Sequence, residues 1–484
     1  MKKNFLITAA LLTLALYGAQ AQNDRDAFRY SLLQPTGTAR HTALGGAMGA
    51  FGADFSTAST NPAALGTYNR SEFSFSPSLY FGNTTIDYNG ESDKDYKSNF
   101  NFGNIGVVLT IPNDEGSWKA VQISTGINRM GNFNSHSNLC GSNMRSSSFV
   151  DYIADQSNDL DIMVDGNGDF TGGSSLGYIA WMGNILGTDA AGNFCSMISG
   201  SDLWQEKAST TRGSMNEYVF SISGNYNDRL FVGATLGIPY FSYHENYTYM
   251  ETNINRKTEA FNSMTYGSFL ESEGSGINFK AGMLYQPANF LRFGVAVHSP
   301  TFYSIEEQYD SRMIVSHDSI GEYKKLASDG EFEYSLTTPY RILADVAFIF
   351  GNYGFINVDY EMADYSIMRL RSETYSFRDE NRDISRMYRA GHTLRAGAEL
   401  NLSPMVLRTG YAYMSNPFNS EVGRDASHNI FSAGFGFRTA SFHIDFAYQY
   451  VTNTDNDRLY KNAPYTYTIQ NANHSAVVTT GWKF

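Results

Sequence analysis

The sequence lacks the features by which most classes of protein are first recognised. It has 484 residues but only two cysteines, Cys140 and Cys195. Beyond its first residues it has no apolar run of 18 or more, which excludes an ordinary transmembrane helix. Basic residues are outnumbered, with 35 Lys and Arg against 48 Asp and Glu, and the net charge is −13. Such an acidic chain is not expected to bind nucleic acid.

Motifs for catalysis are also missing. We find no Gly-x-Ser-x-Gly, His-Glu-x-x-His or Walker-type loop, and we expect neither enzymatic activity nor a cofactor nor a metal site. One run, residues 165–169, has oxygen-bearing side chains at alternate positions, as calcium loops do. Phe170 and Leu176 stand where an EF-hand requires Gly and Glu, which favours a polar turn over a calcium loop.

What the sequence does contain is alternation. Between Glu72 and Phe484, apolar residues recur at every second position in about fourteen segments, as in residues 431–437 and 442–450. One face of each segment is apolar and rich in aromatics, and the other is small or polar, which is typical of strands between lipid and a filled lumen. The 33 Tyr and 34 Phe suit aromatic girdles at the membrane surfaces. We predict an all-β protein, a transmembrane antiparallel β-barrel of about 14 strands in the outer membrane.

The strand cores can be placed along the chain. We predict them at residues 72–81, 99–111, 118–128, 215–226, 230–241, 276–286, 290–301, 331–350, 353–363, 392–402, 405–414, 428–438, 441–451 and 475–484. Alternate connections are tight, at residues 113–117, 227–229, 287–289, 351–352, 403–404 and 439–440. Tight turns belong on the periplasmic side of such a barrel and long loops on the exterior.

The polar faces of the strands carry charges of both signs. We expect these side chains to face one another and to form pairs in the lumen, because an unpaired buried charge is costly. The set comprises Arg292, His298, Asp345, Asp359, Glu361, Arg395, Glu399 and Asp445. The acidic loops would face outer-membrane lipids and lipopolysaccharide. The terminal Phe484, which follows an alternating strand, resembles the signal read by the barrel assembly machinery.

The first 21 residues have the form of a secretory signal peptide. Lys2 and Lys3 precede an apolar run at residues 5–16, and the small residues Ala19 and Ala21 provide a cleavage site. We therefore assign residues 1–21 to the signal, residues 22–70 to an N-terminal segment and residues 71–484 to the barrel.

A long extracellular loop is expected near residues 130–212. It contains both cysteines, and because an exported protein matures in an oxidising compartment, we expect a Cys140–Cys195 disulfide.

The N-terminal segment contains small residues in place of strand periodicity. Its motifs are Gly37-Thr38-Ala39-Arg40, the run from Ala43 to Asp54, and Thr60-Asn61-Pro62-Ala63. They resemble the N-terminal hatch of the FadL family of long-chain fatty-acid and hydrocarbon transporters. Small residues let a plug pack closely within a lumen, Pro62 fixes φ, and Asn61 can turn the chain by bonding its own backbone. The candidate hatch residues are Gly45, Gly46, Asp54, Asn61, Pro62 and Ala63.

The resemblance implies a mechanism. In this family the hatch blocks the lumen, a greasy pocket beside it binds substrate, and a kink in the third strand opens the barrel wall sideways. Gly126 and Gly131 are our candidates for the kink, because glycine in a strand permits a bulge. The expected function is passive uptake of small hydrophobic molecules, above all long-chain fatty acids.

We select candidate substrate-binding residues from two places. The apolar residues Leu176, Ile179, Trp181, Met182 and Ile185 suit a short helix in the long loop, which would either capture substrate or pack on the barrel rim. Arg292 and Arg395 in the lumen could bind a carboxylate.

Two other functions remain open from the sequence. The first is a heme-binding receptor, since relatives of this kind are sometimes labelled hemin receptors, and its iron ligands would be histidines in the predicted loops, His136, His317, His392 and His428. The second is a structural or adhesive barrel without cargo.

Overall fold

The computed structural model describes residues 23–113, 115–143, 147–159, 163–164, 170–171, 175–198, 202–254, 260–461 and 463–484. The predicted signal peptide and the calcium-like run at residues 165–169 lie outside the described residues. Within the described part of the chain, no helix is both long enough and apolar enough to cross a membrane.

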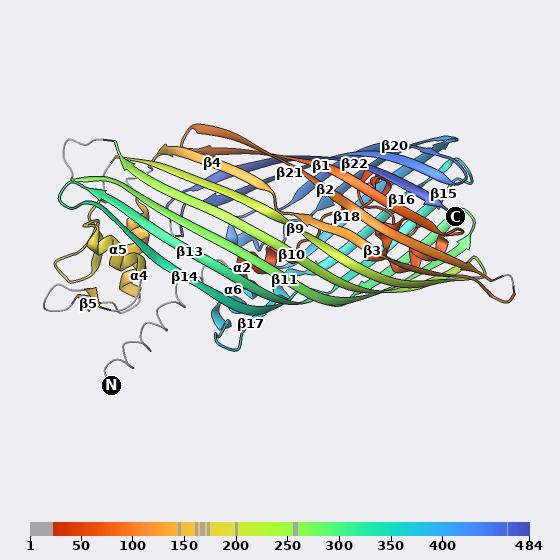
Figure 1. Ribbon diagram of the computed structural model, residues 1–484, viewed down its shortest axis with the longest axis horizontal. Helices are drawn as coiled ribbons and strands as arrows, with labels where there is room; N and C mark the ends of the chain where they lie inside the picture. Colours follow the sequence, from red (N-terminus) through yellow and green to blue (C-terminus); the bar gives the residue numbers. More distant parts are fainter. Residues whose placement is uncertain are drawn as a thin grey trace.

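The wall is a closed antiparallel barrel of 14 strands, several of which are interrupted and therefore carry two labels (Figure 1). In chain order they are β1 (Glu72–Tyr88), β2 (Glu91–Pro112), β3 (Trp118–Asn132) continued by β4 (Ser135–Ser142), β9 (Leu203–Tyr226), β10 (Leu230–Asn253), β11 (Phe261–Ala288), β12 (Leu291–His298) continued by β13 (Phe302–His317), β14 (Gly321–Thr337) continued by β15 (Arg341–Ile349), β16 (Gly354–Asp364) with β17 (Arg369–Arg371), β18 (Ala390–Leu402), β19 (Met405–Met414), β20 (His428–Arg438), β21 (Phe442–Arg458) and β22 (Thr466–Lys483).

The ring closes where β1 pairs with β22, with Glu72 opposite Lys483. Every predicted strand core overlaps one of these strands, although the cores 290–301 and 331–350 extend across breaks after His298 and Thr337, and the tight turns lie at or next to their predicted positions. Most strands run well past their predicted cores. Figure 1 shows β9, β10, β11, β13 and β14 extending beyond the rest of the barrel, at the end opposite the C-terminus. Because the tight turns lie at the C-terminal end, that end is periplasmic and the long hairpins are extracellular.

The two faces of the strands divide as the alternation predicts. Phe293, Val295 and Val297 are 46%, 49% and 56% exposed on the outer surface, whereas His298 at the end of the same strand is buried. Of the eight predicted lumen charges, seven are buried and Arg292 is half-buried. An aromatic and aliphatic outer face around a charged interior confirms the predicted barrel.

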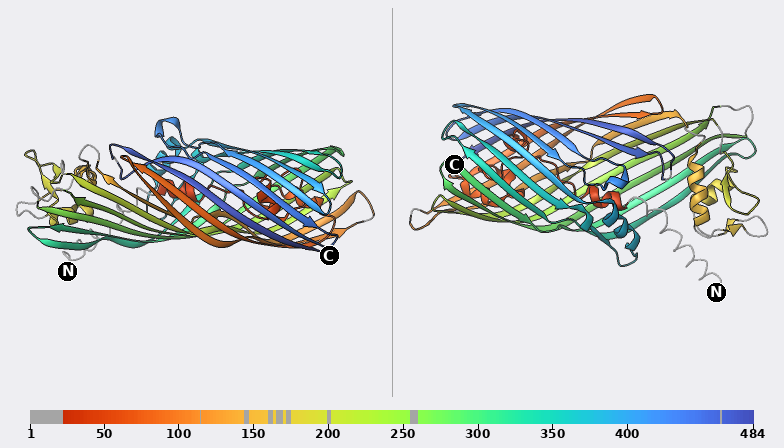
Figure 2. Two further views of the ribbon diagram at one scale, coloured as in Figure 1. Left: turned by 90° about the horizontal axis from the view of Figure 1, so that it is seen from above. Right: turned by 180° about the vertical axis from the view of Figure 1, so that it is seen from behind.

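The N-terminal segment (residues 23–70) lies inside this barrel. It forms the helices α2 (Asn23–Arg29) and α3 (Ala39–Ala43) and the short 3₁₀ turns η1 (Phe55–Ser59) and η2 (Pro62–Thr67). Both views of Figure 2 show it within the ring of strands, and every residue from 37 to 50 is buried. α3 contacts β19–β22, whereas η2 contacts β9–β11 on another part of the wall. The segment therefore crosses the lumen.

The remaining elements lie outside the ring of long strands. The extracellular connection between β4 and β9 contains α4 (Phe149–Asp159), β5 (Met163–Val164), β6 (Phe170–Thr171), α5 (Ser175–Met182), β7 (Leu186–Thr188) and β8 (Phe194–Ser196), and later connections contain η3 (Tyr365–Ile367), α6 (Arg378–Met387) and η4 (Ser420–Val422).

The expected loop near 130–212 is shorter than the sequence suggests, because β4 and the first part of β9 pair with each other across residues 135–142 and 204–211. The alternation is hard to see there because both faces are polar.

The expected Cys140–Cys195 disulfide is wrong for this structure, in which both cysteines are free. Cys140 lies on β4, opposite Glu206, and its thiol donates to the Asp93 carboxylate at 3.3 Å. Cys195 pairs instead with Gly187 in the separate β7–β8 hairpin. Each cysteine is thus held in place by its own pairing.

Candidate functional site

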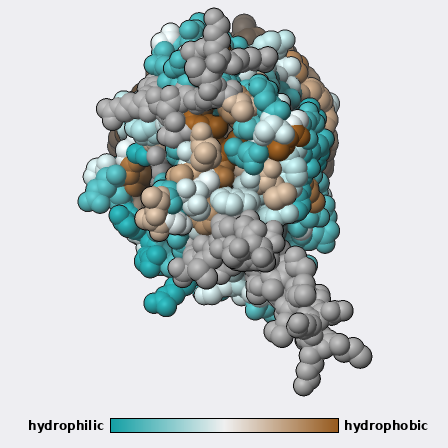
Figure 3. Space-filling view, turned by 90° about the vertical axis from the view of Figure 1, so that its left-hand side faces the viewer, coloured by the Kyte–Doolittle hydropathy of each residue, from teal (hydrophilic) through white to brown (hydrophobic). Residues whose placement is uncertain are grey.

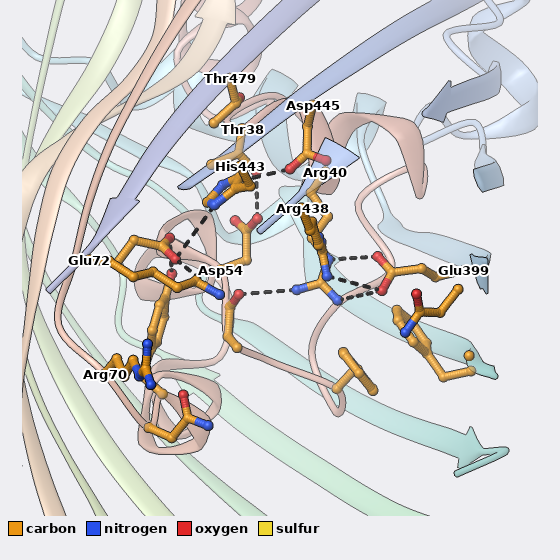
Figure 4. Close-up of a pocket in the computed structure, with 18 of the residues that line it drawn as sticks. Thr38, Arg40, Asp54, Arg70, Glu72, Glu399, Arg438, His443, Asp445 and Thr479 are labelled. Atoms are coloured by element: carbon orange, nitrogen blue, oxygen red, sulfur yellow. Dashed lines mark hydrogen bonds and ion pairs between the residues drawn. The ribbon is translucent and has the colours of Figure 1, made fainter. Parts of the chain in front are cut away.

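The N-terminal segment is bound to the wall first by charge. The guanidinium of Arg40 on α3 donates two hydrogen bonds to Glu399 on β18, at 2.8 and 2.9 Å, and a third to the carbonyl of Ala53 at 3.1 Å. Glu399 also accepts from Arg408 at 2.8 Å, and Arg408 bonds Asp445 at 2.7 Å. Figure 4 shows Arg40, Glu399 and Asp445 of this network beside a pocket at the periplasmic end of the segment. Removing one partner would leave buried charge uncompensated, which makes the network a strong anchor.

A second anchor joins wall carboxylates to the backbone of the segment. Asp359 on β16 accepts the amides of Met48 and Gly49 at 2.9 and 3.0 Å. These amides follow the left-handed turn at Gly45 and Gly46, where φ is +64° and +84°, values that glycine adopts without strain. The predicted hatch glycines therefore aim successive amides at a lumen carboxylate.

The Asn61-Pro62 corner is the third anchor. The Asn61 side chain accepts the amide of Ala63 at 3.2 Å, which caps η2, and it donates to the carbonyl of Gly49 at 3.1 Å and to Asp345 on β15 at 3.2 Å. A single fully buried amide thus joins two parts of the segment and the wall. The carboxylate of Asp54 has a similar local role, since it accepts from Thr38 at 2.6 Å and from the amide of Ser56 at 2.9 Å.

Glycines of the wall make room for these contacts. A Cβ atom on Gly282 would lie 2.0 Å from the Oδ1 of Asn61, and one on Gly410 would lie 2.1 Å from the carbonyl carbon of Leu44. These wall glycines were not among the predicted site residues. The sequence shows them only as small residues on inward-facing strand positions, a signal that is shared with many other glycines.

The wall is incomplete beside this segment. Pairing between β2 and β3 ends at Asn104 opposite Asn128, and an irregularity follows between Arg129 and Gly131. Beyond it, β3 and β4 pair only with β9, and residues 91–102 of β2 pair only with β1. We call this interruption the wall gap.

At its extracellular end the wall gap is closed by side chains. Asp95 accepts the amide of Asn138 at 2.7 Å, and Asp93 accepts that of Cys140 at 3.1 Å.

Residues 32–37, which we call the strap, pass behind the wall gap from inside. The amide of Gln34 donates to the carbonyl of Met130 at 3.0 Å, and the Thr36 hydroxyl donates to the carbonyl of Arg129 at 2.6 Å. On the other edge, a Cβ on Gly103 would lie 2.3 Å from the Gly37 carbonyl oxygen, so β2 also approaches the strap closely. The strap thus satisfies backbone groups of β3 that β2 leaves unpaired.

Of the two predicted kink residues, Gly126 lies where a Cβ would be 2.3 Å from the carbonyl of Ile105 and 2.6 Å from the ring of Phe55. Gly131 adjoins the irregularity but has room for a side chain, since Met215 is 3.6 Å from its ideal Cβ. Their role in opening the wall stays a prediction.

A cavity lies between the strap and the strands on either side of the wall gap. We call it the gap cavity; it is lined by residues of the strap, β1, β2, β3 and β19–β22. Apolar and neutral polar side chains make up most of its lining. Its apolar lining residues include Leu32, Pro35, Met414, Ile430, Val451 and Val477.

The predicted binding residues lie elsewhere. On α5 and just after it, Ile179 and Ile185 are buried in an extracellular core, against which Leu176 and Trp181 also pack, while Met182 is 43% exposed. Of the two alternatives for this helix, substrate capture and packing on the barrel rim, the structure favours packing. Figure 3 shows that this end of the molecule is largely hydrophilic, with hydrophobic residues in patches.

The two predicted carboxylate-binding arginines already have partners in the protein. Arg292 donates to the carbonyl of Phe51 at 2.6 Å and to Gln286 at 2.9 Å, and Arg395 bonds Glu361 at 2.5 Å. Arg292 therefore holds the N-terminal segment, and Arg395 neutralises a wall carboxylate.

The four histidines considered as heme ligands lie on strands, not in loops. They are distributed over β4, β13, β18 and β20, and each bonds a nearby group: Thr210 for His136, Ser319 for His317, Tyr360 for His392 and the carbonyl of Ala426 for His428. Among the described residues, no group of three or more His, Cys, Asp and Glu side chains is arranged to hold a metal ion.

The fold and the filled lumen define a class of protein, an outer-membrane transport barrel. A family model agrees: that of the outer membrane protein transport proteins (OMPP1/FadL/TodX) matches residues 204–482, more than half of the chain. The chain belongs to this family, whose members are membrane transporters and not enzymes. No curated protein matches the chain.

Solved structures show the same fold at low identity. A FadL homologue of Pseudomonas aeruginosa is 14% identical with a TM-score of 0.59, and the match covers 94% of this chain and 100% of that one. The toluene transporter TodX of Pseudomonas putida is 11% identical, with a TM-score of 0.54 and coverage of 93% and 99%. The toluene transporter TbuX of Ralstonia pickettii is 16% identical, with a TM-score of 0.52 and coverage of 94% and 100%.

The Asn61 anchor gives a direct test. Asn61→Ala removes one cap and two bonds in a buried site, and we expect it to destabilise the N-terminal segment by about 1–3 kcal/mol while the barrel stays folded. Hydrogen exchange in residues 44–66 should accelerate, whereas heat-modifiable migration on gels should be unchanged. The exposed Asn69 provides the control, since Asn69→Ala should change neither. Unchanged exchange in Asn61→Ala would show that this corner does not hold the segment.

Proposed function

We propose that the protein takes up small hydrophobic molecules, above all long-chain fatty acids, at the outer membrane by passive diffusion, and that they leave sideways through the wall gap. The observation that carries this proposal is the end of β2–β3 pairing at Asn104 and Asn128, directly beside the strap. A route straight through the lumen is opposed by the N-terminal segment, whose residues 37–50 are all buried.

The interior on the extracellular side of the strap suits such molecules. It is an apolar cluster in which Tyr30 stacks on Phe241 at 3.9 Å between ring centroids, close to Met130 and Met215. Apolar burial contributes about 25 cal/mol per Å², so a long alkyl chain gains several kcal/mol on leaving water for such surroundings. The cluster adjoins β3 near Met130, where the strap bonds the wall. An alkyl chain bound in the cluster would therefore lie next to the wall gap.

Release into the bilayer needs no opening of the charged anchors. Glu399, Asp359 and Asp345 hold the N-terminal segment on the opposite side of the lumen from β3, by contacts with α3, residues 48–49 and Asn61. At the wall gap the segment is held by neutral hydrogen bonds, two from the strap to β3 and one from the Asn128 side chain to Ser59. Each such neutral bond contributes about 0.5–1.5 kcal/mol, so movement of the strap costs far less than extraction of the whole segment.

Photolabelling tests the route. A palmitate analogue with a photoreactive group on its chain should label peptides that contain residues 32–37, 101–103 or 129–132, because these border the gap cavity. Mass spectrometry of the labelled, folded protein would locate the adducts, and excess unlabelled palmitate should reduce them. Labelling confined to residues 175–186 would instead place the binding site on α5 and contradict a route through the wall gap.

The proposed driving force gives a second test. Expression of the protein in cells that lack other fatty-acid transporters of this type should increase the uptake of labelled oleate. That increase should persist when the inner-membrane proton gradient is collapsed, provided that the cytoplasmic trapping step is assayed separately, because diffusion down a gradient is not coupled to energy. Loss of outer-membrane passage on collapse would rule out the passive mechanism.

A further inference from the structure

Arg129 occupies a special position in the wall. It is the first residue of β3 after the last β2–β3 pair, and its own carbonyl accepts the strap hydroxyl of Thr36. Its side chain points inward, where Arg129 lines the gap cavity and also a neighbouring cavity on the other side of the strap. The residue is only 9% exposed.

The guanidinium of Arg129 makes no hydrogen bond or ion pair with any residue that the structure describes. Other cationic side chains of the lumen are paired: Arg40 bonds Glu399, Arg408 bonds Asp445, Lys280 bonds Glu217, and Arg341 and Arg395 both bond Glu361. Arg129 is not among the described residues with fully enclosed, unbonded polar atoms, so its nitrogens reach the cavities. Arg129 is therefore a buried cation directed into these two cavities.

Within the part of the chain that the structure describes, no carboxylate is placed to neutralise this cation. The gap cavity has no Asp or Glu in its lining. The neighbouring cavity has one, Glu361, but its two oxygens are taken by Arg341 and Arg395. A buried charge without a partner is unfavourable, and an arginine fork is well shaped to bind a carboxylate through two parallel bonds.

We propose that Arg129 binds the acidic headgroup of the cargo at the wall gap, so that the protein selects single-chain anionic amphiphiles over neutral hydrocarbons of similar size. The proposal rests on the proposed function and names the substrate class for that site. The carboxylate meets Arg129 at the edge of the wall gap, while the alkyl chain lies along Leu32, Pro35 and Ile430 within the gap cavity. This role replaces the one that the sequence suggested for Arg292 and Arg395.

The test compares two ligands that differ in their headgroup. Equilibrium binding of radiolabelled oleate and of oleyl alcohol is measured on the purified full-length protein in a neutral amphipol. The wild-type protein should bind oleate more tightly than the alcohol. Arg129→Gln should raise the Kd for oleate about tenfold or more, because the hydrogen bonds between the charged guanidinium and the carboxylate are lost. It should leave the Kd for the alcohol unchanged. Arg129→Lys should keep part of the preference for oleate.

The control is Arg312→Gln, which removes an arginine that is exposed on β13 and paired with Asp310. It should bind both ligands as the wild type does, and heat-modifiable migration would verify that each variant is folded. If Arg129→Gln weakened both ligands equally, or neither, the headgroup role would be refuted while the proposed function stood. If the wild-type protein bound neither ligand, the proposed function would fall as well.

Discussion

A barrel that encloses charged side chains at membrane depth must neutralise them, and the rest of this structure depends on that constraint. The wall does not do so alone. Glu399 receives Arg40 from the N-terminal segment as well as Arg408 from β19, and Asp359 receives backbone amides of the segment. The N-terminal segment is therefore part of the charge balance of the lumen, and its removal would leave several buried carboxylates with fewer partners.

At the wall gap, backbone polar groups need partners in the same way as the charges of the lumen do. A strand edge in a membrane barrel must have its amides and carbonyls satisfied, and β3 loses its partner after Asn128. The strap supplies the missing bonds at Arg129 and Met130 from inside. A few neutral bonds replace a strand ladder there, which supports the proposal that the wall opens at this point, and Arg129 lies beside the same cavity.

The sequence predicted what periodicity and local chemistry determine. Fourteen strand cores, the tight turns and the inward charges followed from alternation, and the Asn61-Pro62 corner followed from the conformational preferences of those two residues. The extracellular parts of the strands were missed because both of their faces are polar, as in residues 206–212 of β9. For α5, an apolar run alone could not distinguish a capture surface from a packed helix.

Features that depend on pairing between distant residues were beyond the sequence. The free state of Cys140 depends on its neighbours on β2 and β9. The wall gap exists only in the register of β2 against β3. The sequence does not distinguish Arg129 from Arg292 and Arg395. Which of these cations lacks a carboxylate partner depends on contacts between distant residues.

The central claim, that the N-terminal segment closes the lumen, is tested most directly by conductance in planar bilayers. The full-length protein should conduct small polar ions poorly. A variant that lacks residues 37–66 should still fold, because the β1–β22 ladder closes the ring without the segment and water in the emptied lumen solvates the carboxylates that lose their partners. Its conductance should rise to that of an open pore. A folded deletion variant with the same low conductance as the parent would contradict the account.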